Sequence, residues 1–437
     1  MMNTLNIRET CALGFMAFAL FLGAGNIIFP PFIGLQAGSH VWTAAAGFLV
    51  TGVGLPVLSV IGLAKAGGEM GNIISPVGKI AGNMLIVACY LFIGPLFASP
   101  RTATVSYELG IAAFTGTAGN AQYYYSFVYF VIAALVALFP GRLLESVGQI
   151  LAPLKILSLV VLGVAVMLLP AVPLQPPVAG YVAAPLSSGI VNGYLTMDTL
   201  AGLAFGMVVV NAVRARGMES QAHITHYTIK AGIIAGVGLV LVYLSLFMLG
   251  MKSTYLAPDA TNGADVLRAF VQHHFGGRGT LLLGVLITLS CLVTAIGLTC
   301  SCAGYFSILT PFGYRPLVMF FAILSFIISC AGLDTLIRVS VPVLIAVYPP
   351  FIMLIVISFV RHRLSQPVRV IAPATAVAFL CGMFDGLGAA GLERFVPAVY
   401  ISLPLHGQQM AWLLPAGIML LLSFSVSRIS RTAQATS

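Results

Sequence analysis

Charged residues are scarce in this sequence. Asp, Glu, Lys and Arg make up only 7% of the 437 residues, whereas hydrophobic residues make up 59% and the mean hydropathy is +1.05. Soluble domains carry about 25% charged residues, so a chain this poor in charge cannot cover a globular surface in contact with water. We therefore predict an all-α polytopic membrane protein whose main surroundings are the lipid bilayer.

Motifs of several other protein classes are also missing. The sequence has no G-x-x-x-x-G-K-[ST] loop that would hold a nucleotide phosphate, which excludes an ATP-driven pump from this chain. The seven cysteines all lie in apolar runs, and their spacing matches no zinc pattern. The polar residues inside the apolar runs are too scattered in depth to form a catalytic cluster. We therefore predict neither an enzyme nor a cofactor.

Apolar runs long enough to cross a bilayer repeat along the chain. A helix needs about 20 apolar residues to span the roughly 30 Å hydrocarbon core. The runs predict about twelve spans in a single transmembrane domain over residues 1–437. They lie near residues 10–37, 41–64, 80–112, 123–140, 149–169, 193–213, 227–251, 279–308, 316–332, 335–360, 370–389 and 407–427.

The lysine and arginine residues lie mostly on one side of these spans. If the N-terminus is cytoplasmic, thirteen of the 20 fall in cytoplasmic segments, four in outer segments and three within or at the ends of spans. Cytoplasmic loops of membrane proteins carry such an excess. We therefore expect a multi-pass protein of the cell inner (cytoplasmic) membrane with both termini in the cytoplasm. The same bias explains the net charge of +9, so no nucleic-acid partner is expected.

The first predicted span is interrupted. The run Gly23 to Asn26 is followed by Pro30 and Pro31. Glycine favours unwinding, and proline cannot donate a backbone hydrogen bond within a helix. Unwound backbone is tolerated at membrane depth only where protein or a cavity satisfies its polar groups. At 1.5 Å per residue the break lies about 25 Å beyond Arg8, in the middle to outer half of the bilayer.

The sixth predicted span carries a carboxylate. Asp198 is accompanied there by Thr199 and Gly202, and it lies about 24 Å from the cytoplasmic end of the span. A carboxylate at that depth costs at least about 2.5–3.5 kcal/mol unless it is paired or hydrated, so it is a functional candidate. The alternative is an aspartate that caps the outer end of a half-helix.

A second break is expected in the sixth span, near Asp198 to Gly202, so the two breaks lie five positions apart in the order of the spans. Paired interrupted helices at matching positions of two halves are typical of inverted-repeat transporters, whose site lies at the repeat interface. The N-termini of half-helices offer N–H groups and a positive dipole end to a carboxylate, while unwound carbonyls offer oxygens to a cation. The sequence therefore predicts a binding site between the two breaks, near the bilayer midplane.

The eighth predicted span offers further oxygen ligands. Ser290, Thr294, Gly297 and Ser301 share one helical face, and Thr299 lies on an adjoining face. A stripe of hydroxyls that faces the first break would complete the oxygen shell of a sodium ion. The alternative is a stripe of small residues that packs against another helix.

Two cationic residues fall within the predicted spans. Lys155 lies about 20 Å into the fifth span, where a buried lysine either pairs with a neighbour or replaces a bound cation. Arg101 lies about 33 Å past Lys79, which is close to the outer interface. We expect Arg101 to be an outer-vestibule or gating residue with Glu108 as its partner.

The stretch 259–274, between the seventh and eighth spans, is the most polar in the chain. An apolar stripe of Val266, Leu267, Phe270 and Val271 runs through it at helical spacing. This pattern predicts a short outer helix over the vestibule.

Four sequence runs carry a resemblance to a known family. Residues 23–31 (GAGNIIFPP), 94–105 (GPLFASPRTATV) and 195–198 (LTMD) resemble the branched-chain amino acid:cation symporters, as do residues 340–344 (SVPVL) with 348–350 (YPP). The likeness covers essentially the whole chain. It implies a leucine-transporter-like fold with an inverted five-helix repeat and broken helices 1 and 6. The first repeat would occupy residues 1–170 (spans 1–5) and the second 190–361 (spans 6–10), followed by spans 11–12 in 370–427.

The resemblance also implies a set of binding residues. The substrate carboxylate would meet the first break, and the substrate side chain would lie in an apolar pocket between spans one, three, six and eight. Together with the second break, the expected substrate-binding residues are Gly23, Ala24, Gly25, Asn26, Phe97, Ala98, Asp198, Thr199, Gly202 and Phe205. The expected sodium ligands are Ala19, Leu22, Asn26, Thr294, Thr299 and Ser301.

The leading hypothesis is a secondary active symporter. It would import leucine, isoleucine and valine coupled to sodium by alternating access, as the resemblance implies. Proton coupling through Lys155 or Asp198 is the alternative, because proton-coupled carriers of similar fold place a lysine on span five near this sodium position. A channel or a membrane sensor is less favoured, since neither rings of pore-lining polar residues nor a soluble output domain is evident.

Overall fold

The computed structural model describes residues 5–112, 120–139, 156–157, 159–170, 173–361, 364 and 366–435. Within these ranges every regular element is a helix. The longer elements are α1 (Ile7–Phe21), α2 (Ala24–Ala37), α3 (Val41–Leu49), α4 (Leu55–Lys65), α5 (Met70–Ile74), α6 (Lys79–Leu91), α7 (Ala98–Gly110), α9 (Ala121–Ala137), α11 (Ala179–Ala183), α12 (Pro185–Tyr194), α13 (Asp198–Arg214), α14 (Gln221–Lys252), α15 (Gly263–Leu309), α16 (Tyr314–Ser329), α17 (Leu333–Ser358), α18 (Pro367–Ala389), α19 (Ala398–Ile401) and α20 (Leu413–Ala435).

Shorter helical turns join or interrupt these elements. Two of them, η2 (Val50–Gly54) and η4 (Phe92–Leu96), are π-helical and continue the helices before them. The others are the 3₁₀ turns η1 (Gly38–His40), η3 (Ser75–Val77), η6 (Glu393–Phe395) and η7 (His406–Gln408).

Each of the twelve predicted spans overlaps a helix in the part of the chain that the structure describes. Of residues 149–169 the structure describes only a part, including the helix Leu159–Leu168. By length and apolar composition, six described helical stretches could cross a membrane, and the bent pair α12–α13 would be a seventh. Four shorter apolar helices, among them α9 and α16, raise the number of candidate spans in the described residues towards the predicted twelve.

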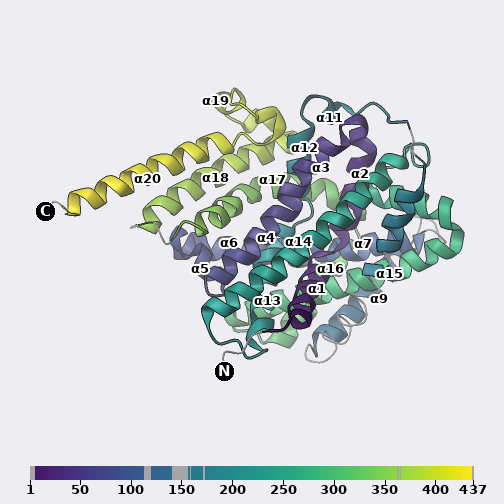
Figure 1. Cartoon of the computed structure of the whole chain (residues 1–437), viewed down its shortest axis with the longest axis horizontal. Coiled ribbons are helices and arrows are strands. Elements are labelled where there is room, and N and C mark those ends of the chain that lie inside the picture. The colour runs from purple at the N-terminus through teal and green to yellow at the C-terminus, as the bar shows by residue number, and fades with distance from the viewer. Residues whose placement is uncertain are drawn as a thin grey trace.

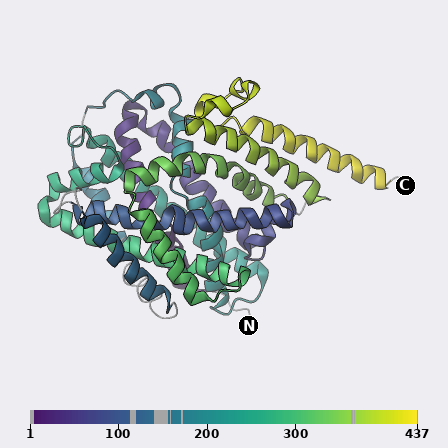
Figure 2. The ribbon, with the colours of Figure 1, turned by 180° about the vertical axis from the view of Figure 1, so that it is seen from behind.

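The helices form a bundle with an extension at one end (Figure 1). In the bundle α14 packs against α1 and α2, α15 packs against α7, and α13 packs against α4. The neighbouring helices α17, α18 and α20 lie side by side, and α20 reaches away from the bundle towards the C-terminus (Figure 2). The outer surface is rich in exposed apolar side chains, such as Leu135, Leu168, Leu241 and Leu421, which suits contact with lipid.

The helix predicted in residues 259–274 is present. It forms the first part of α15, and its apolar stripe is buried. Asn262 caps it by accepting hydrogen bonds from the N–H groups of Ala264 and Asp265, at 2.8 and 3.3 Å. Gly276, whose φ is 63°, separates this part from the longer apolar part of α15. A positive φ is easily adopted only by glycine.

Helices α2 and α14 cross with their backbones almost in contact. A Cβ placed on Gly250 would lie 1.9 Å from the carbonyl oxygen of Pro31, and a Cβ on Gly34 would lie 2.3 Å from the carbonyl oxygen of Phe247. Only glycine fits at such a distance, as at close helix crossings in membranes generally. This crossing fixes the orientation of α2, and therefore the position of the first helix break.

We predict that Gly250→Ala lowers the thermal unfolding temperature of the detergent-solubilised protein, because overpacking a close crossing costs about 1–3 kcal/mol. Gly304→Ala is the control, since a Cβ at Gly304 meets no neighbouring atom within 4 Å. That variant should stay within about 0.5 kcal/mol of the parent. Equal unfolding temperatures for the two variants would contradict the close crossing.

Candidate functional site

The first break is shorter than the sequence suggested. Helix α1 ends at Phe21 and α2 begins at Ala24, so only Leu22 and Gly23 are non-helical, and Gly23 is extended with φ −98° and ψ −164°. The expectation of unwinding through Asn26 was wrong, because Ala24, Gly25 and Asn26 form the first turn of α2. The two prolines lie inside α2 and do not end it. Their fixed φ suits a helix, and neighbouring helices can satisfy the freed carbonyls.

The second break lies just before Asp198. Helix α12 ends at Tyr194, α13 begins at Asp198, and the two are bent by 45°. Met197 between them has a positive φ of 63°. The expectation that the break extends to Gly202 was also wrong. Gly202 lies within α13, where a Cβ would stand 3.0 Å from the carbonyl oxygen of Pro56, so this glycine permits close packing on α4.

The two breaks meet at one buried cavity. A Cβ placed on Gly25 would lie 3.2 Å from the Cα of Thr196 and 3.4 Å from the carbonyl oxygen of Leu195. The cavity has a volume of about 30 Å³. It is lined by Leu20, Phe21, Gly23, Ala24, Gly25, Asn26, Ala98, Arg101, Thr102, Thr196, Met197, Asp198, Ala201, Phe205, Thr294 and Leu298.

Asp198, Asn26 and Tyr243 form a hydrogen-bonded triangle beside this cavity. The Asn26 amide donates to Asp198 Oδ2 and to the Tyr243 hydroxyl, and the hydroxyl also donates to Asp198 Oδ2, at 3.2 Å. All three side chains are buried. As the first residue of α13, Asp198 lies at the positive end of a helix dipole, which stabilises its charge. Tyr243 was not predicted, because a tyrosine inside a long apolar helix carries no distinguishing sequence signal.

The side chain of Asn26 also holds the first break in shape. Its Oδ1 accepts a hydrogen bond from the backbone N–H of Gly23, at 3.2 Å, while its amide nitrogen bonds to Asp198. One side chain therefore joins the start of α2 to the start of α13. The N–H groups in the first turn of both helices have no partner within their own helix, and both turns lie at the cavity.

Arg101 lies at the level of the breaks, which corrects the expectation of an outer-vestibule position beside Glu108. Its guanidinium donates to the carbonyl oxygen of Leu195 at 2.6 Å and to Ser340 Oγ at 2.7 Å, and its central carbon lies 5.2 Å from the centre of the Phe29 ring. The depth estimate failed because the third span is not one straight helix. It is kinked in η4 at Gly94, where φ is −90° and ψ is −116°.

Seven of the ten predicted substrate-binding residues line the cavity. They are Gly23, Ala24, Gly25, Asn26, Ala98, Asp198 and Phe205. Phe97 does not line it, and instead its ring stacks on that of Phe92 at 5.6 Å. Thr199 is buried and donates to the carbonyl oxygen of Thr51, at 3.4 Å. The cavity wall also includes residues that were not predicted. Among them, the Phe21 ring meets the Phe205 ring edge to face, at 5.8 Å.

The predicted sodium ligands come together only in part. Ser290 Oγ donates to the carbonyl oxygen of Leu22, at 3.4 Å, so the eighth span does face the first break. Thr294 lines the cavity, whereas Thr299 and Ser301 do not. Ser301 donates to a carbonyl oxygen of its own helix, at 2.8 Å. Among the other predicted residues, Ala19 precedes this break on α1. Lys155 lies outside the described residues.

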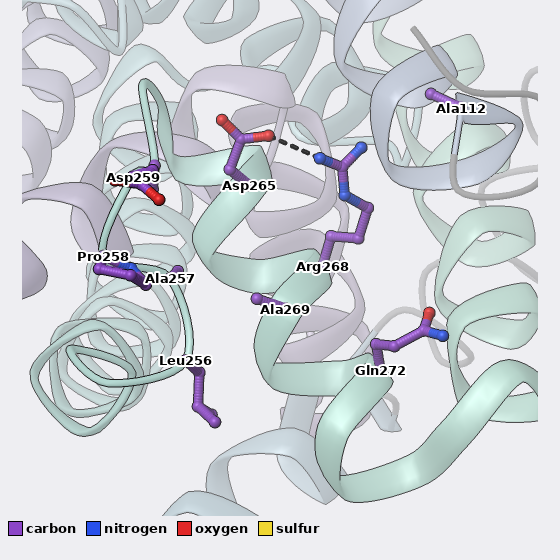
Figure 3. Close-up of a pocket in the computed structure, with 10 residues that line it drawn as sticks. Ala112, Leu256, Ala257, Pro258, Asp259, Asp265, Arg268, Ala269 and Gln272 are labelled. Carbon is purple, nitrogen blue, oxygen red and sulfur yellow. Dashed lines mark hydrogen bonds and ion pairs between the residues drawn. The ribbon is translucent and has the colours of Figure 1, made fainter.

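A second, open cavity of about 640 Å³ lies beside the first part of α15 (Figure 3). Asp265 and Arg268 form an ion pair at 2.8 Å on its wall, close to Asp259 and Gln272. The loop from Leu256 contributes an apolar part of the wall. This open cavity shares no lining residue with the buried cavity between the breaks.

Two solved structures share the fold of this chain. One is a nucleobase-cation-symport-1 family transporter in a closed conformation with bromovinylhydantoin bound, with a TM-score of 0.64 and 13% identity over 97% of this chain and 93% of that chain. The other is MhsT in complex with L-phenylalanine, with a TM-score of 0.53 and 14% identity over 95% of this chain and 98% of that chain. The fold is therefore the leucine-transporter-like fold of membrane transporters, with broken helices 1 and 6.

Sequence comparison identifies the family. The model of the family described as "Branched-chain amino acid transport protein" matches residues 6–430. The chain is also 55% identical over 415 residues to the branched-chain amino acid transport system 3 carrier protein of Pseudomonas aeruginosa, over 95% of each chain. The chain belongs to the branched-chain amino acid transport protein family, which confirms the resemblance. It is a transport family rather than an enzyme family.

Proposed function

We propose that this protein is a secondary active symporter that imports branched-chain amino acids by alternating access. The observation that supports this most directly is the buried cavity between the two helix breaks. The first turn of α2 and the first turn of α13, which begins with Asp198, meet there. The names of its relatives, which are carriers and permeases for branched-chain amino acids, support the same substrate class.

In this proposal each part of the amino acid meets a complementary surface. The carboxylate accepts hydrogen bonds from the first-turn N–H groups of α2 at Ala24 and Gly25, at the positive end of that helix. The ammonium group lies towards Asp198. The branched side chain packs on Phe21 and Phe205, which give the cavity an apolar wall.

The size of the cavity supports alternating access. A volume of about 30 Å³ accommodates one or two water molecules, but not a branched-chain amino acid. The helices around the breaks must therefore move apart to admit the substrate. Loops and domains of many enzymes open and close over a binding site in the same way. We propose that residues 1–170 and 190–361 act as the two repeats in this motion.

We propose sodium as the coupled ion, bound beside the first break. The carbonyls of Ala19 and Leu22 and the hydroxyl of Thr294 supply oxygen ligands of the kind that sodium requires. The contact between Ser290 and Leu22 supports this assignment, because it brings the eighth span to the break. Proton coupling through Asp198 or Lys155 is the second candidate, since Asp198 is a buried carboxylate next to the cavity. We further propose an inner-membrane location with both termini in the cytoplasm.

Uptake of labelled leucine into proteoliposomes tests this proposal. We expect an inward sodium gradient to drive accumulation of leucine above its external concentration, and we expect isoleucine and valine to compete. A pH gradient without sodium should not drive it. Liposomes that contain no protein are the control.

Three other results would change the proposal. Accumulation driven by a pH gradient alone would favour proton coupling. Leucine that only equilibrates across the membrane under every gradient would indicate a channel or a uniporter. No leucine uptake under any gradient would remove the proposed substrate class.

A further inference from the structure

Arg101 is a buried group in the cavity wall whose hydrogen bonds are incomplete. The residue is only 2% exposed, and its two terminal nitrogens donate to Leu195 and Ser340. The remaining donor, the Nε–H group, has no acceptor. A buried donor that is left unsatisfied is destabilising, and more so when it belongs to a charged group. Such a donor in the wall of a binding cavity indicates a ligand that supplies the missing acceptor.

The surroundings of Arg101 indicate the charge of that ligand group. The acceptor of one guanidinium nitrogen, the Leu195 carbonyl oxygen, lies 3.4 Å from the Cβ position of Gly25 in the first turn of α2. The Phe29 ring, which faces the guanidinium, lies 3.4 Å from the same position. The charge of Arg101 and the positive end of the α2 dipole therefore converge on one side of the cavity, which favours an anionic group.

Three contacts hold the guanidinium in one orientation. Leu195 lies at the second helix break, Ser340 is on α17, and Phe29 is on α2, so three separate elements position one side chain of α7. A planar guanidinium that is fixed in this way presents its remaining Nε–H in one direction, which suits a single oxygen of a carboxylate. The ammonium group of a lysine would not provide this geometry.

We propose that Arg101 binds the carboxylate of the substrate through its Nε–H group, together with the first turn of α2. This inference rests on the proposed function and makes Arg101 a specificity-determining residue. It selects α-amino acids over amines and amides that have the same side chain. Asp198, which accepts hydrogen bonds from Asn26 and Tyr243, lines the same cavity and would face the ammonium end of the same molecule.

The test compares two probes on the full-length protein in nanodiscs. L-leucine and L-leucinamide share a side chain and an ammonium group, but only leucine has a carboxylate. We measure the affinity for each probe with the parent protein, Arg101→Gln, Arg101→Lys and the control Arg268→Gln. Arg268 lines the open cavity beside α15 and is paired with Asp265, so its loss removes an arginine without touching the buried cavity.

We expect the parent and Arg268→Gln to prefer leucine strongly. In Arg101→Gln the ratio of leucine affinity to leucinamide affinity should fall by about 10- to 100-fold, which corresponds to the loss of a charged hydrogen bond. Arg101→Lys should lie in between, because it retains the charge but loses the planar geometry. The ratio is the readout because a purely structural role of Arg101 would weaken the binding of both probes equally.

Other outcomes separate this inference from the proposed function. If the parent binds leucine and Arg101→Gln keeps the parent ratio, the inference is overturned and the proposed function stands. If Arg101→Gln does not fold, Arg101→Lys decides, and an unchanged ratio in that variant overturns the inference. If the parent binds no leucine, the proposed function itself fails.

Discussion

Replacing Asp198 with Asn is expected to lower the initial rate of leucine uptake by about 100-fold or more, since removing one partner of a buried charged interaction costs about 3–5 kcal/mol. Asparagine keeps the shape of the side chain but carries no charge for the ammonium group of the substrate. It also accepts the hydrogen bonds of Asn26 and Tyr243 more weakly than a carboxylate does. The measurement is leucine uptake into proteoliposomes under an inward sodium gradient, at matched protein content.

The control for this variant is Asp385→Asn. Asp385 is a second buried carboxylate in an apolar helix, and it accepts a hydrogen bond from the N–H of Trp412 at 3.3 Å. It lies on α18 and is not among the residues that line the cavity. We expect Asp385→Asn to transport at close to the parent rate. Parent-like kinetics of Asp198→Asn would instead return Asp198 to a structural role as a helix cap.

The second large effect is expected at Gly25. A methyl group there would lie 3.2 Å from the Cα of Thr196, so the two breaks would have to move apart by a few tenths of an ångström. Small displacements of binding groups reduce rates strongly, about 100-fold for a shift near 1 Å. We therefore expect Gly25→Ala to reduce the kcat/KM for leucine about tenfold and Gly25→Val about 100-fold. Concentration-dependent uptake measures both values.

Gly417→Ala is the matched control for the Gly25 series. Gly417 lies on α20, where a Cβ meets no atom within 4 Å. This variant should transport like the parent. A Gly25→Val protein that folds and transports normally would show that the first turn of α2 does not contact the substrate.

The sequence predicted the fold well because the membrane restricts the possible structures. Apolar runs must be helical in lipid, and polar or glycine-rich interruptions such as Gly23 and Asp198 must then line a cavity. This reasoning found both broken helices and most of the residues that meet between them. It placed the breaks too broadly, because glycine and proline do not by themselves end a helix. Gly202 serves close packing on α4, and Pro30 continues α2.

Two parts of the site depend on tertiary structure and could not be read from the sequence. Tyr243 joins Asp198 only because α14 crosses α2 at the Gly250 contact. The position of Arg101 was misjudged because depth was counted along a straight helix, whereas the third span is kinked at Gly94. Residue counts give depth only where the helix is continuous.

The backbone at Met197 has a consequence for the balance between conformations. A residue with a side chain costs about 1–2 kcal/mol in the left-handed region, where Met197 lies with a φ of 63°. Any state in which α12 and α13 realign and Met197 leaves this region gains that energy. The gain multiplies the population of such a state by a factor of about 5 to 30. If the bend before Asp198 straightens when the cavity opens, relief of the strain at Met197 therefore favours the open state.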